Sequence, residues 1–246
     1  MSQTLQRAIT ILAMVSEQPR RIAEIAAELG VHHSTALRLV HTLRDNRLLL
    51  EQPDHAYRLG SGLLTLANRA LEQIDLRDIA KPSMRALGEA TRETVHLAVM
   101  EGGSVVYLDK VEADHPVRMY SRIGGLAPVH CTGVGKAILA HLDEDERAAV
   151  LAGEELARHT QHTITDPDVL ERELAEVRRT GVALDREEHE LGIHCIAAPI
   201  GGTGTRAALS ISAPASRLSF SALEALATPL RAATDEITAA LGEGRP

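Results

Sequence analysis

The chain has 246 residues, of which 44% are hydrophobic, and this is enough for two modest domains or one large one. No run approaches a membrane span of about 18 apolar residues, and the N-terminus lacks the basic-then-apolar order of a secretion signal, so we expect a cytoplasmic protein with no membrane partner. The formal charge of −8 does not exclude a nucleic-acid partner, because residues 1–60 hold seven Lys and Arg against six Asp and Glu and the acidity falls on the rest.

The N-terminal 46 residues are predicted to form three helices. Apolar side chains recur at three- and four-residue steps in three segments, residues 5–16, 21–29 and 34–45. Gln18-Pro19 separates the first helix from the second, and Gly30 supplies the left-handed residue that ends the second. The apolar stripe of the third helix consists of Ala36, Leu39, Val40 and Leu43. A short second helix followed by a tight turn and a third helix predicts a helix-turn-helix.

A β-hairpin and a connecting helix are expected next. Residues 48–52 and 56–59 are typical of strands, and Pro53-Asp54-His55 between them favours a turn. This hairpin is the candidate wing of a winged helix-turn-helix domain over residues 1–60. Ser61 can cap a helix over residues 63–73, which would form a linker helix within residues 61–75.

Residues 76–246 alternate strands and helices without a regular strand-helix-strand repeat. Helices are expected over residues 76–92, 133–142, 144–152, 166–179 and 219–241, with Pro82 in a first turn or at a kink. Strands are expected over residues 94–100, 104–111, 117–120, 182–184, 195–200 and 207–212. Paired strands with helices between them indicate an α+β domain on an antiparallel sheet. The predicted fold class is therefore α+β, with an N-terminal winged helix-turn-helix and a linker helix.

The outer side of the third helix carries side chains that can form hydrogen bonds to DNA. If the apolar stripe packs inward, the residues that face outward are His33, Ser34, Thr35, Leu37, Arg38, His41 and Thr42. Such a helix fits the major groove, where Arg binds guanine through two bonds and Ser, Thr or His reaches base edges or phosphates. His55 and Arg58 on the wing can reach the adjacent backbone or minor groove. Double-stranded DNA is therefore the predicted partner, and a three-helix scaffold that binds no DNA is the alternative.

Four blocks of sequence resemble the IclR family of bacterial transcription regulators. IAEIAAELGVHHSTALRLVHTL, residues 22–43, resembles its winged helix-turn-helix, and YRLGSGLLTLA, residues 57–67, resembles the entry into its linker helix. GGLAPVHCTGVGKAILA, residues 124–140, and DREEHELGIHCIAAPI, residues 185–200, continuing to AALSISAP at 207–214, resemble the signatures of its effector domain. The resemblance covers nearly the whole chain. It implies a repressor that forms a homodimer or homotetramer, with a GAF-like effector-binding domain over residues 76–246.

The resemblance also implies a ligand, a small organic acid of the keto, sugar or aromatic kind. No cofactor is expected. The family's pocket implies Gly133 and Val134 as amide donors, Asp185 and Cys195 at the rim, Ser210 and Ser212 from the following strand, and Met119 and Ala127 as the apolar wall. The polar character of this set favours a hydroxylated or keto acid over an aromatic one.

Two of these features also have a direct physical interpretation. Residues 130–136 form a glycine-containing loop that leads into a helix, whose first amides can bind an anion. Alternatively, the glycines only permit a tight turn and Lys136 points to solvent. Ser210 and Ser212 are two positions apart on a strand, so both face the same side, in a shared pocket or as ordinary surface hydroxyls.

Cysteine and histidine residues raise two further possibilities. His130, Cys131, His189, His194 and Cys195 are metal-ligating types, but their spacing is not that of a closed structural zinc site, so no metal is predicted. A thiol-dependent hydrolase using Cys131 or Cys195 is the enzymatic alternative. Adjacent His-Cys side chains point apart in an extended chain, and a hydrolase has no use for a DNA reader. We therefore expect a protein that is not an enzyme, with both cysteines reduced.

Overall fold

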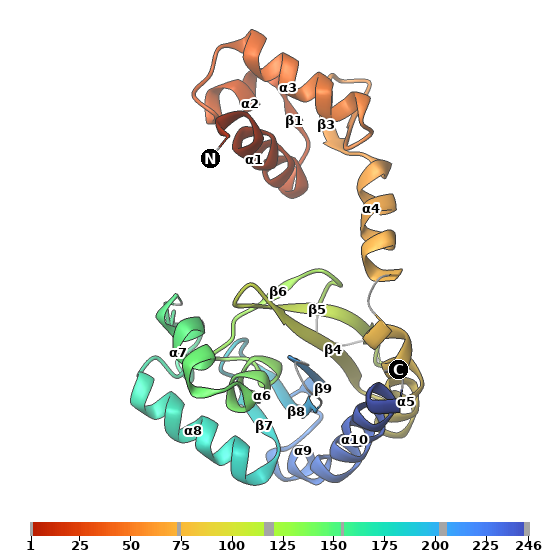
Figure 1. Ribbon diagram of the computed structural model, residues 1–246, viewed down its shortest axis with the longest axis vertical. Coiled ribbons are helices and arrows are strands. Elements are labelled where there is room, and N and C mark those ends of the chain that lie inside the picture. Colours follow the sequence, from red (N-terminus) through yellow and green to blue (C-terminus); the bar gives the residue numbers. More distant parts are fainter. Residues whose placement is uncertain (1, 73–74, 116–120, 154, 202–205, 244–246) are drawn as a thin grey trace. The chain divides into compact units, whose positions relative to one another are not determined.

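The computed structural model describes residues 2–72, 75–115, 121–153, 155–201 and 206–243 (Figure 1). The strand expected over residues 117–120 and the candidate wall residue Met119 lie outside the described residues. The chain divides into two compact units, Met1–Ile74 and Asp75–Pro246. None of the helices within the described ranges is both long and apolar enough to cross a lipid bilayer.

The N-terminal unit folds as a winged helix-turn-helix, as the sequence predicts. Its elements are α1 (Gln3–Glu17), β1 (Arg20–Arg21), α2 (Ile22–Glu28), α3 (His33–Asp45), β2 (Leu49–Glu51), β3 (Ala56–Leu59) and α4 (Ser61–Glu72). Strand β3 lies between β1 and β2 and pairs antiparallel with both. Arg21 was expected to begin the second helix, but it belongs to β1 and precedes α2. A two-residue strand is too short to show an alternating pattern in the sequence.

The apolar stripe of α3 is inside the N-terminal unit, which confirms the predicted orientation of this helix. Ala36 and Val40 are fully buried, and Leu39 and Leu43 are 8% and 6% exposed. All four belong to a cluster that includes buried side chains of α1 and α2. Each fully buried aliphatic side chain stabilises the fold by roughly 1.5–3 kcal/mol. The spacing of the apolar residues therefore determines which side of α3 faces outward.

The start of α4 is fixed to the base of the wing by backbone contacts. The Gly60 amide donates to the Leu48 carbonyl at 2.8 Å, and the Gly62 amide donates to the Arg47 carbonyl at 2.9 Å. A Cβ atom at either glycine would lie less than 3.0 Å from that Arg47 carbonyl oxygen, which real side chains do not tolerate. The helix begins at Ser61 itself, two residues before the predicted start, because glycines on both sides let the chain turn tightly here.

The C-terminal unit is an α+β domain on an antiparallel sheet, which confirms the predicted fold class. Its helices are α5 (Asp75–Thr91), α6 (Gly133–His141), α7 (Glu144–Ala152), α8 (Pro167–Thr180), α9 (Phe220–Ala225) and α10 (Ala227–Glu243). Its strands are β4 (Thr94–Glu101), β5 (Ser104–Val111), β6 (Leu126–Ala127), β7 (Ala183–Arg186), β8 (Ile193–Ile200) and β9 (Ala207–Pro214). Across the described residues, the sheet order is β6-β5-β4-β9-β8-β7.

Two helix predictions in this unit need correction. The single helix expected over residues 219–241 is divided into α9 and α10 at Leu226. Pro229 explains the break, because a proline has no N–H for a helical bond to residue 225 and its ring clashes with that carbonyl, so it is tolerated only in the first turn of a new helix. Pro82 lies inside α5, so the first-turn alternative is wrong and a kink at Pro82 stays a prediction. Strand β6 was not predicted and, like β1, has only two residues.

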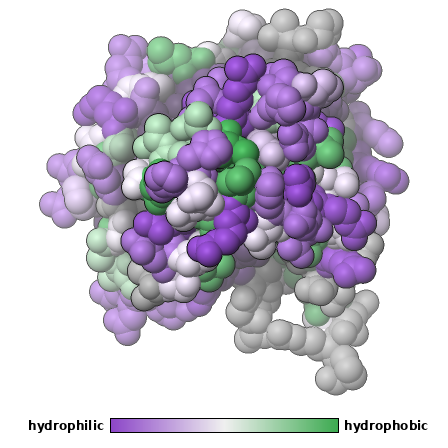
Figure 2. Space-filling view, turned by 90° about the horizontal axis from the view of Figure 1, so that it is seen from above, coloured by the Kyte–Doolittle hydropathy of each residue, from purple (hydrophilic) through white to green (hydrophobic). Residues whose placement is uncertain are grey.

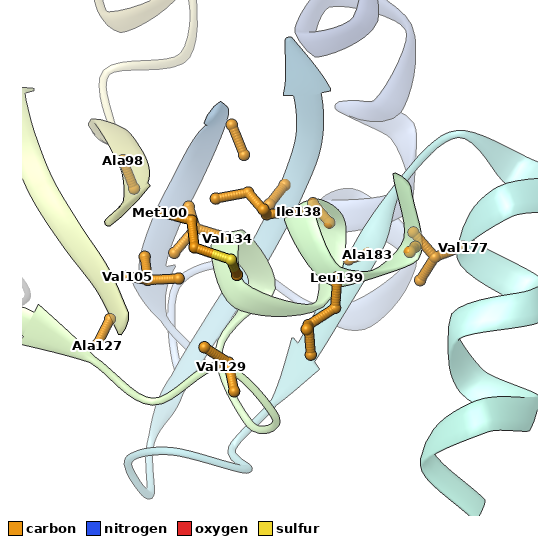
Figure 3. Close-up of a cluster of buried hydrophobic side chains, with 14 of the residues drawn as sticks. Ala98, Met100, Val105, Ala127, Val129, Val134, Ile138, Leu139, Val177 and Ala183 are labelled. Carbon is orange, nitrogen blue, oxygen red and sulfur yellow. The ribbon is translucent and has the colours of Figure 1, made fainter. Parts of the chain in front are cut away.

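Helices cover both faces of this sheet (Figure 1). On one face, α6 packs on β7, β8 and β9, and α8 packs on α6. Figure 3 shows the buried side chains of this layer, among them Val134 and Ile138 of α6, Met100 of β4 and Val177 of α8. On the other face lie α5, α9 and α10. The sheet side chains that face α6 are therefore enclosed, and polar ones among them must find partners there.

The surface is predominantly hydrophilic on the face seen in Figure 2, with hydrophobic residues in small groups. Large apolar side chains with substantial exposure in the described N-terminal unit are Leu5, Ile9, Leu50, Leu64 and Leu66. Single exposed apolar side chains are normal on a soluble protein. Two of them lie on α1 and two on α4.

Candidate DNA-binding surface and effector pocket

The outer surface of α3 begins at a capped N-terminus. The His32 ring accepts the Ser34 N–H at 3.3 Å, and its Nδ1 lies 2.9 Å from the Ser34 hydroxyl. His33, Ser34, Arg38 and Thr42 are exposed, and Thr35, Leu37 and His41 are half-buried. The Thr42 hydroxyl donates to the Arg38 carbonyl at 2.9 Å, so its oxygen remains an acceptor. The predicted outward residues thus share one helix face, and their contacts with DNA stay a prediction.

One flank of this face opens into a groove of about 400 Å³, here called the α3 groove. It is lined by Arg21, Ile22, Ala23, His33, Leu37, His41, Glu51, His55 and Tyr57. It brings together His33 and His41 of α3 with His55 of the wing. Arg21, which was not among the predicted DNA-binding residues, adds a cation to this groove. The adjacent basic pair Arg20-Arg21 is the signal that points to it.

The two predicted wing residues have different surroundings. His55 is the turn residue of the hairpin, with a left-handed φ of 62°, and its Nδ1 lies 3.0 Å from Glu51 Oε1. The hydrogen bond from His55 is the first reason that the pKa of Glu51 is lowered. Arg58 lines a separate groove with Arg44 and Arg47, beside the start of α4. The structure therefore does not bring Arg58 and His55 into one groove.

In the C-terminal unit, the predicted pocket residues converge on the face of the sheet that α6 covers. Asp185, Cys195 and Ser212 are register partners across β7, β8 and β9, and Ser210 is the partner of His96 on β4. Register partners point to the same side of a sheet. Ser210 and Ser212 are 1% and 2% exposed, so the alternative of ordinary surface hydroxyls is wrong.

The N-terminus of α6 lies against this row of polar side chains. The Thr132 side chain caps the helix by accepting the Gly135 amide at 3.1 Å, and its hydroxyl donates to the Pro128 carbonyl at 2.6 Å. Gly133 and Val134 are the first two residues of the helix, where amides have no acceptor within the helix. A Cβ atom on Gly133 would meet Cys195 Sγ at 3.2 Å. The first turn of α6 therefore lies directly over Cys195.

A small cavity of about 10 Å³ lies at this point, with room for about one water molecule. It is lined by Tyr107, Thr132, Gly133, Val134, Asp185, His189, Glu190, Ile193 and Cys195. Gly133, Val134, Asp185 and Cys195 are thus placed together as the family resemblance implied. Ala127 lies in the neighbouring apolar cluster and not in the cavity wall.

Histidine 96 holds the polar side chains behind the cavity together. Its Nδ1 lies 3.5 Å from both the Ser210 and Ser212 hydroxyls, and its Nε2 lies 2.8 Å from the Ser121 hydroxyl. Ser212 also donates to Cys195 Sγ at 3.1 Å. Burial, followed by the charge of Lys110, lowers the pKa of His96 to about 4, so the ring is neutral at pH 7. Sequence reasoning missed His96, Tyr107, Ser121 and Thr132, which are single polar residues within apolar segments or loops.

The titratable groups around the cavity have strongly shifted pKa values. Burial is the main cause that raises the pKa of Asp185 to about 7, and the Glu188 carboxylate adds to it. Burial also raises the pKa of Cys131 and of Cys195 to about 12, with the charge of Asp185 as the second cause. Both cysteines are therefore protonated at pH 7, whereas a cysteine nucleophile must be a thiolate. This opposes the hydrolase alternative.

Lysine 136 does not point to solvent, so that part of the alternative for residues 130–136 is wrong. Its side chain is fully buried, and its Nζ lies 2.6 Å from Glu188 Oε1 and 3.2 Å from Glu173 Oε1. A buried ammonium needs such carboxylate partners, because an unpaired buried charge is strongly destabilising. Lys136 thus ties α6 to α8 and to the turn after β7.

The metal-ligating types noted in the sequence do not assemble as one set. Among the described residues, His130 and Cys131 come together with His159, which the sequence analysis did not include. His194 instead has its Nδ1 3.1 Å from the Leu218 carbonyl and its ring edge-on to Phe220. Cys195 contacts Ser212 as described above.

Comparison with known proteins gives one consistent family. Residues 4–53 match the IclR helix-turn-helix domain, and residues 68–239 match the family described as bacterial transcriptional regulator IclR C-terminal. The chain is 35% identical over 245 residues to the HTH-type transcriptional regulator XynR of Escherichia coli, covering 98% of this chain and 97% of XynR. It is 32% identical over 254 residues to the transcriptional repressor IclR of Escherichia coli, covering 98% of this chain and 90% of that protein.

A solved structure extends the comparison to the fold. An IclR homolog from Microbacterium hydrocarbonoxydans, crystallised in complex with 4-hydroxybenzoate, superposes with a TM-score of 0.84 and 31% sequence identity. The match covers 98% of this chain and 100% of that one. These relatives are regulators of transcription, which agrees with the expectation that the chain is not an enzyme.

Proposed function

Because the chain belongs to the IclR family of bacterial transcriptional regulators, we propose that it is a repressor whose binding to operator DNA is controlled by a small organic acid in its C-terminal unit. The DNA-binding part rests on one observation, the orientation of α3. Its apolar stripe is buried and its polar face, with Arg38, is exposed. A helix with this face fits the major groove of B-DNA.

The residues of α3 and of the wing divide into two roles. Arg38 is the candidate for two bonds to a guanine, with Ser34 and Thr42 beside it on the exposed face. His33, at the helix start, is placed to contact a phosphate. The α3 groove contains Arg21 and His55, and this supports contacts to the DNA backbone beside the major groove. Thr35, His41 and Arg58 complete the proposed DNA-binding set.

The ligand part of the proposal rests on the cavity at the start of α6. The free amides of Gly133 and Val134 provide an anion site at the positive end of the helix, and a carboxylate is its natural occupant. The homolog complexed with 4-hydroxybenzoate supports an organic acid, and keto and sugar acids remain candidates. A cavity of about 10 Å³ is too small for any of them. Binding therefore requires the lining side chains to move apart. The ligand would then bind the conformation with the enlarged cavity better than the closed one, and so shift the equilibrium between the two.

Self-association completes the proposal, as a homodimer or homotetramer whose paired wings read two half-sites. Exposed apolar side chains on two helices of the N-terminal unit support it. Leu5 and Ile9 on α1 are 62% and 52% exposed, and Leu64 and Leu66 on α4 are 68% and 56% exposed.

The Arg38→Ala variant tests the DNA-binding part. We expect its affinity for DNA from the upstream intergenic region to fall roughly tenfold to a hundredfold, because one bidentate base contact is lost. Fluorescence anisotropy with labelled duplex, at several salt concentrations, measures this. Arg172→Ala, which removes an exposed arginine from α8, is the matched control and should bind as the wild type does. Equal affinity of the wild type and Arg38→Ala would favour the scaffold alternative instead.

A further inference from the structure

Three metal-ligating side chains from two separate segments converge beside the cavity. His130 and Cys131 come from the loop before α6, and His159 comes from the loop between α7 and α8. One potential ligand atom from each lies within 4.8 Å of the other two. Two nitrogens and one thiolate sulfur at such separations are within reach of a single ion, since zinc binds nitrogen at about 2.0–2.1 Å and sulfur at about 2.3 Å.

The His130 ring has a hydrogen-bond partner of the kind that metal-bound imidazoles commonly have. Its Nε2 lies 3.0 Å from the Ala157 carbonyl oxygen. A carbonyl only accepts hydrogen bonds, so Nε2 carries the hydrogen and the lone pair of the neutral ring is on Nδ1. Metal-bound histidines typically donate their other N–H to a backbone carbonyl in this manner. Ala157 and His159 belong to the same loop, so one segment both orients His130 and supplies the third ligand.

The loop that carries His159 is fixed by hydrogen bonds to the turn after β7. The Thr163 hydroxyl accepts the His159 amide at 3.1 Å and donates to the Glu188 carbonyl at 2.6 Å. The Thr160 hydroxyl donates to the Glu187 carbonyl, also at 2.6 Å. The backbone at His159 is therefore held in place before any ion binds, which lowers the entropic cost of assembling the site.

From this geometry we propose that His130, Cys131 and His159 bind one divalent transition-metal ion of the zinc class. Two imidazoles and a thiolate are ligands for zinc and not for the oxygen-preferring magnesium or calcium. His130 and Cys131 are buried and His159 is exposed, so the ion enters from the His159 side. His189, whose ring centroid is 5.3 Å from that of His159, is a further imidazole next to these three residues.

Binding changes the chemistry of Cys131 and the mobility of the pocket. The Sγ–metal bond replaces the S–H bond, and the proton leaves to solvent. The ion joins the α7–α8 loop to the residue just before Thr132, the cap of α6. Because Gly133 and Val134 follow that cap, the metal would fix the helix start that forms the proposed acid site. The metal proposal does not depend on the proposed function.

Cobalt binding to the purified, chelator-stripped chain tests the site. Wild-type protein titrated with Co²⁺ should develop a thiolate-to-cobalt charge-transfer band that saturates at one ion per chain, and Zn²⁺ should displace it. His159→Ala should weaken Co²⁺ affinity by at least roughly 10- to 100-fold. Its exposed position makes this variant safe for folding. Cys131→Ser should lose the charge-transfer band, and circular dichroism checks its fold.

His162→Ala is the matched control. It removes an exposed histidine ring from the same loop, a ring whose described hydrogen bond is to Gln161, and the variant should bind Co²⁺ as the wild type does. The proposal is overturned if the wild type shows no saturable charge-transfer band, or if His159→Ala matches the wild type. Operator affinity, measured on the same samples, reports separately on the DNA-binding function.

Discussion

At the scale of single residues, Asp185 is a buried group whose charge state changes near pH 7. It is 5% exposed, and burial raises its pKa to about 7, from 3.8. The folded protein therefore holds a proton that the unfolded chain releases at lower pH. Stability from this group is present in full below pH 4, falls as the pH rises towards 7, and is lost above it.

Asp185→Asn should therefore stabilise the C-terminal unit most at high pH. At pH 8 we expect its free energy of unfolding to rise by about 1–3 kcal/mol, because the variant no longer buries a carboxylate. At pH 4.5 the gain should shrink towards zero. Urea unfolding at both pH values measures this, with Asp235→Asn as an exposed control on α10. A gain that is equal at the two pH values would contradict the role assigned to burial.

The residues of the candidate pocket were only partly predictable. Gly133, Val134, Asp185 and Cys195 lie in sequence blocks that resemble known signatures, so they could be named in advance. His96 could not, because its partner Ser210 is 114 positions away and only the pairing of β4 with β9 brings them together. The buried ion pairs of Lys136 could not be predicted for the same reason, since its partners Glu173 and Glu188 are distant in sequence.

At the scale of elements, the N-terminus of α6 places the positive end of the helix dipole at the cavity. Its first two residues, Gly133 and Val134, line the cavity and have amides free of helical bonds. A side chain on Gly133 would contact Cys195 Sγ and Ala197 Cβ at 3.2 Å. Glycine therefore leaves space above Cys195 here, and it does not serve an unusual backbone angle.

Gly133→Ala should remove the response to organic acids while leaving operator binding intact. The added methyl occupies the space above Cys195, but alanine favours helix and the added contacts are tight without being severe. Thermal shift and operator release are measured with 4-hydroxybenzoate, a keto acid and a sugar acid, because a bound acid stabilises the fold by mass action.

Gly153→Ala is the control, since a Cβ there meets only ordinary contacts at 3.6 Å or more. If Gly133→Ala responds to the same acids as strongly as the wild type does, the acid binds elsewhere.

Elements with a long repeating pattern were predicted from the sequence, and short or interrupted ones were not. The stripe of α3 extends over enough residues to define a face, so its orientation was predicted. Strands β1 and β6 have two residues each, and their pairing with β3 and β5 defines them. Pro229, by contrast, was a visible signal for the break between α9 and α10.

At the scale of the whole molecule, charge and function are divided between the units. The 60 N-terminal residues are nearly neutral, while the rest of the chain holds 19 Lys and Arg against 28 Asp and Glu. An acidic unit repels the DNA backbone, so the N-terminal unit must supply the phosphate contacts. A single DNA-binding unit with few cations binds DNA weakly, and the proposed pairing of two copies on one operator would compensate for this.

Leu64→Arg tests whether copies pair through the N-terminal unit. Leu64 is 68% exposed on α4. If Leu64 lies in an apolar interface between two copies, an arginine at this position would bury an unpaired charge there, which is strongly unfavourable. We expect the variant to have a smaller mass in solution than the wild type, measured by light scattering after gel filtration. Its affinity for an operator with two half-sites should fall, and its affinity for a single half-site should not.

Leu191→Arg provides the comparison that makes this result specific. Leu191 is 59% exposed, similar to Leu64, but it lies in the turn before β8 of the C-terminal unit. A general effect of placing arginine on the surface would change both variants alike. Loss of pairing in Leu64→Arg alone would place α4 in the interface that sets the half-site spacing, whereas an unchanged mass would exclude Leu64 from it.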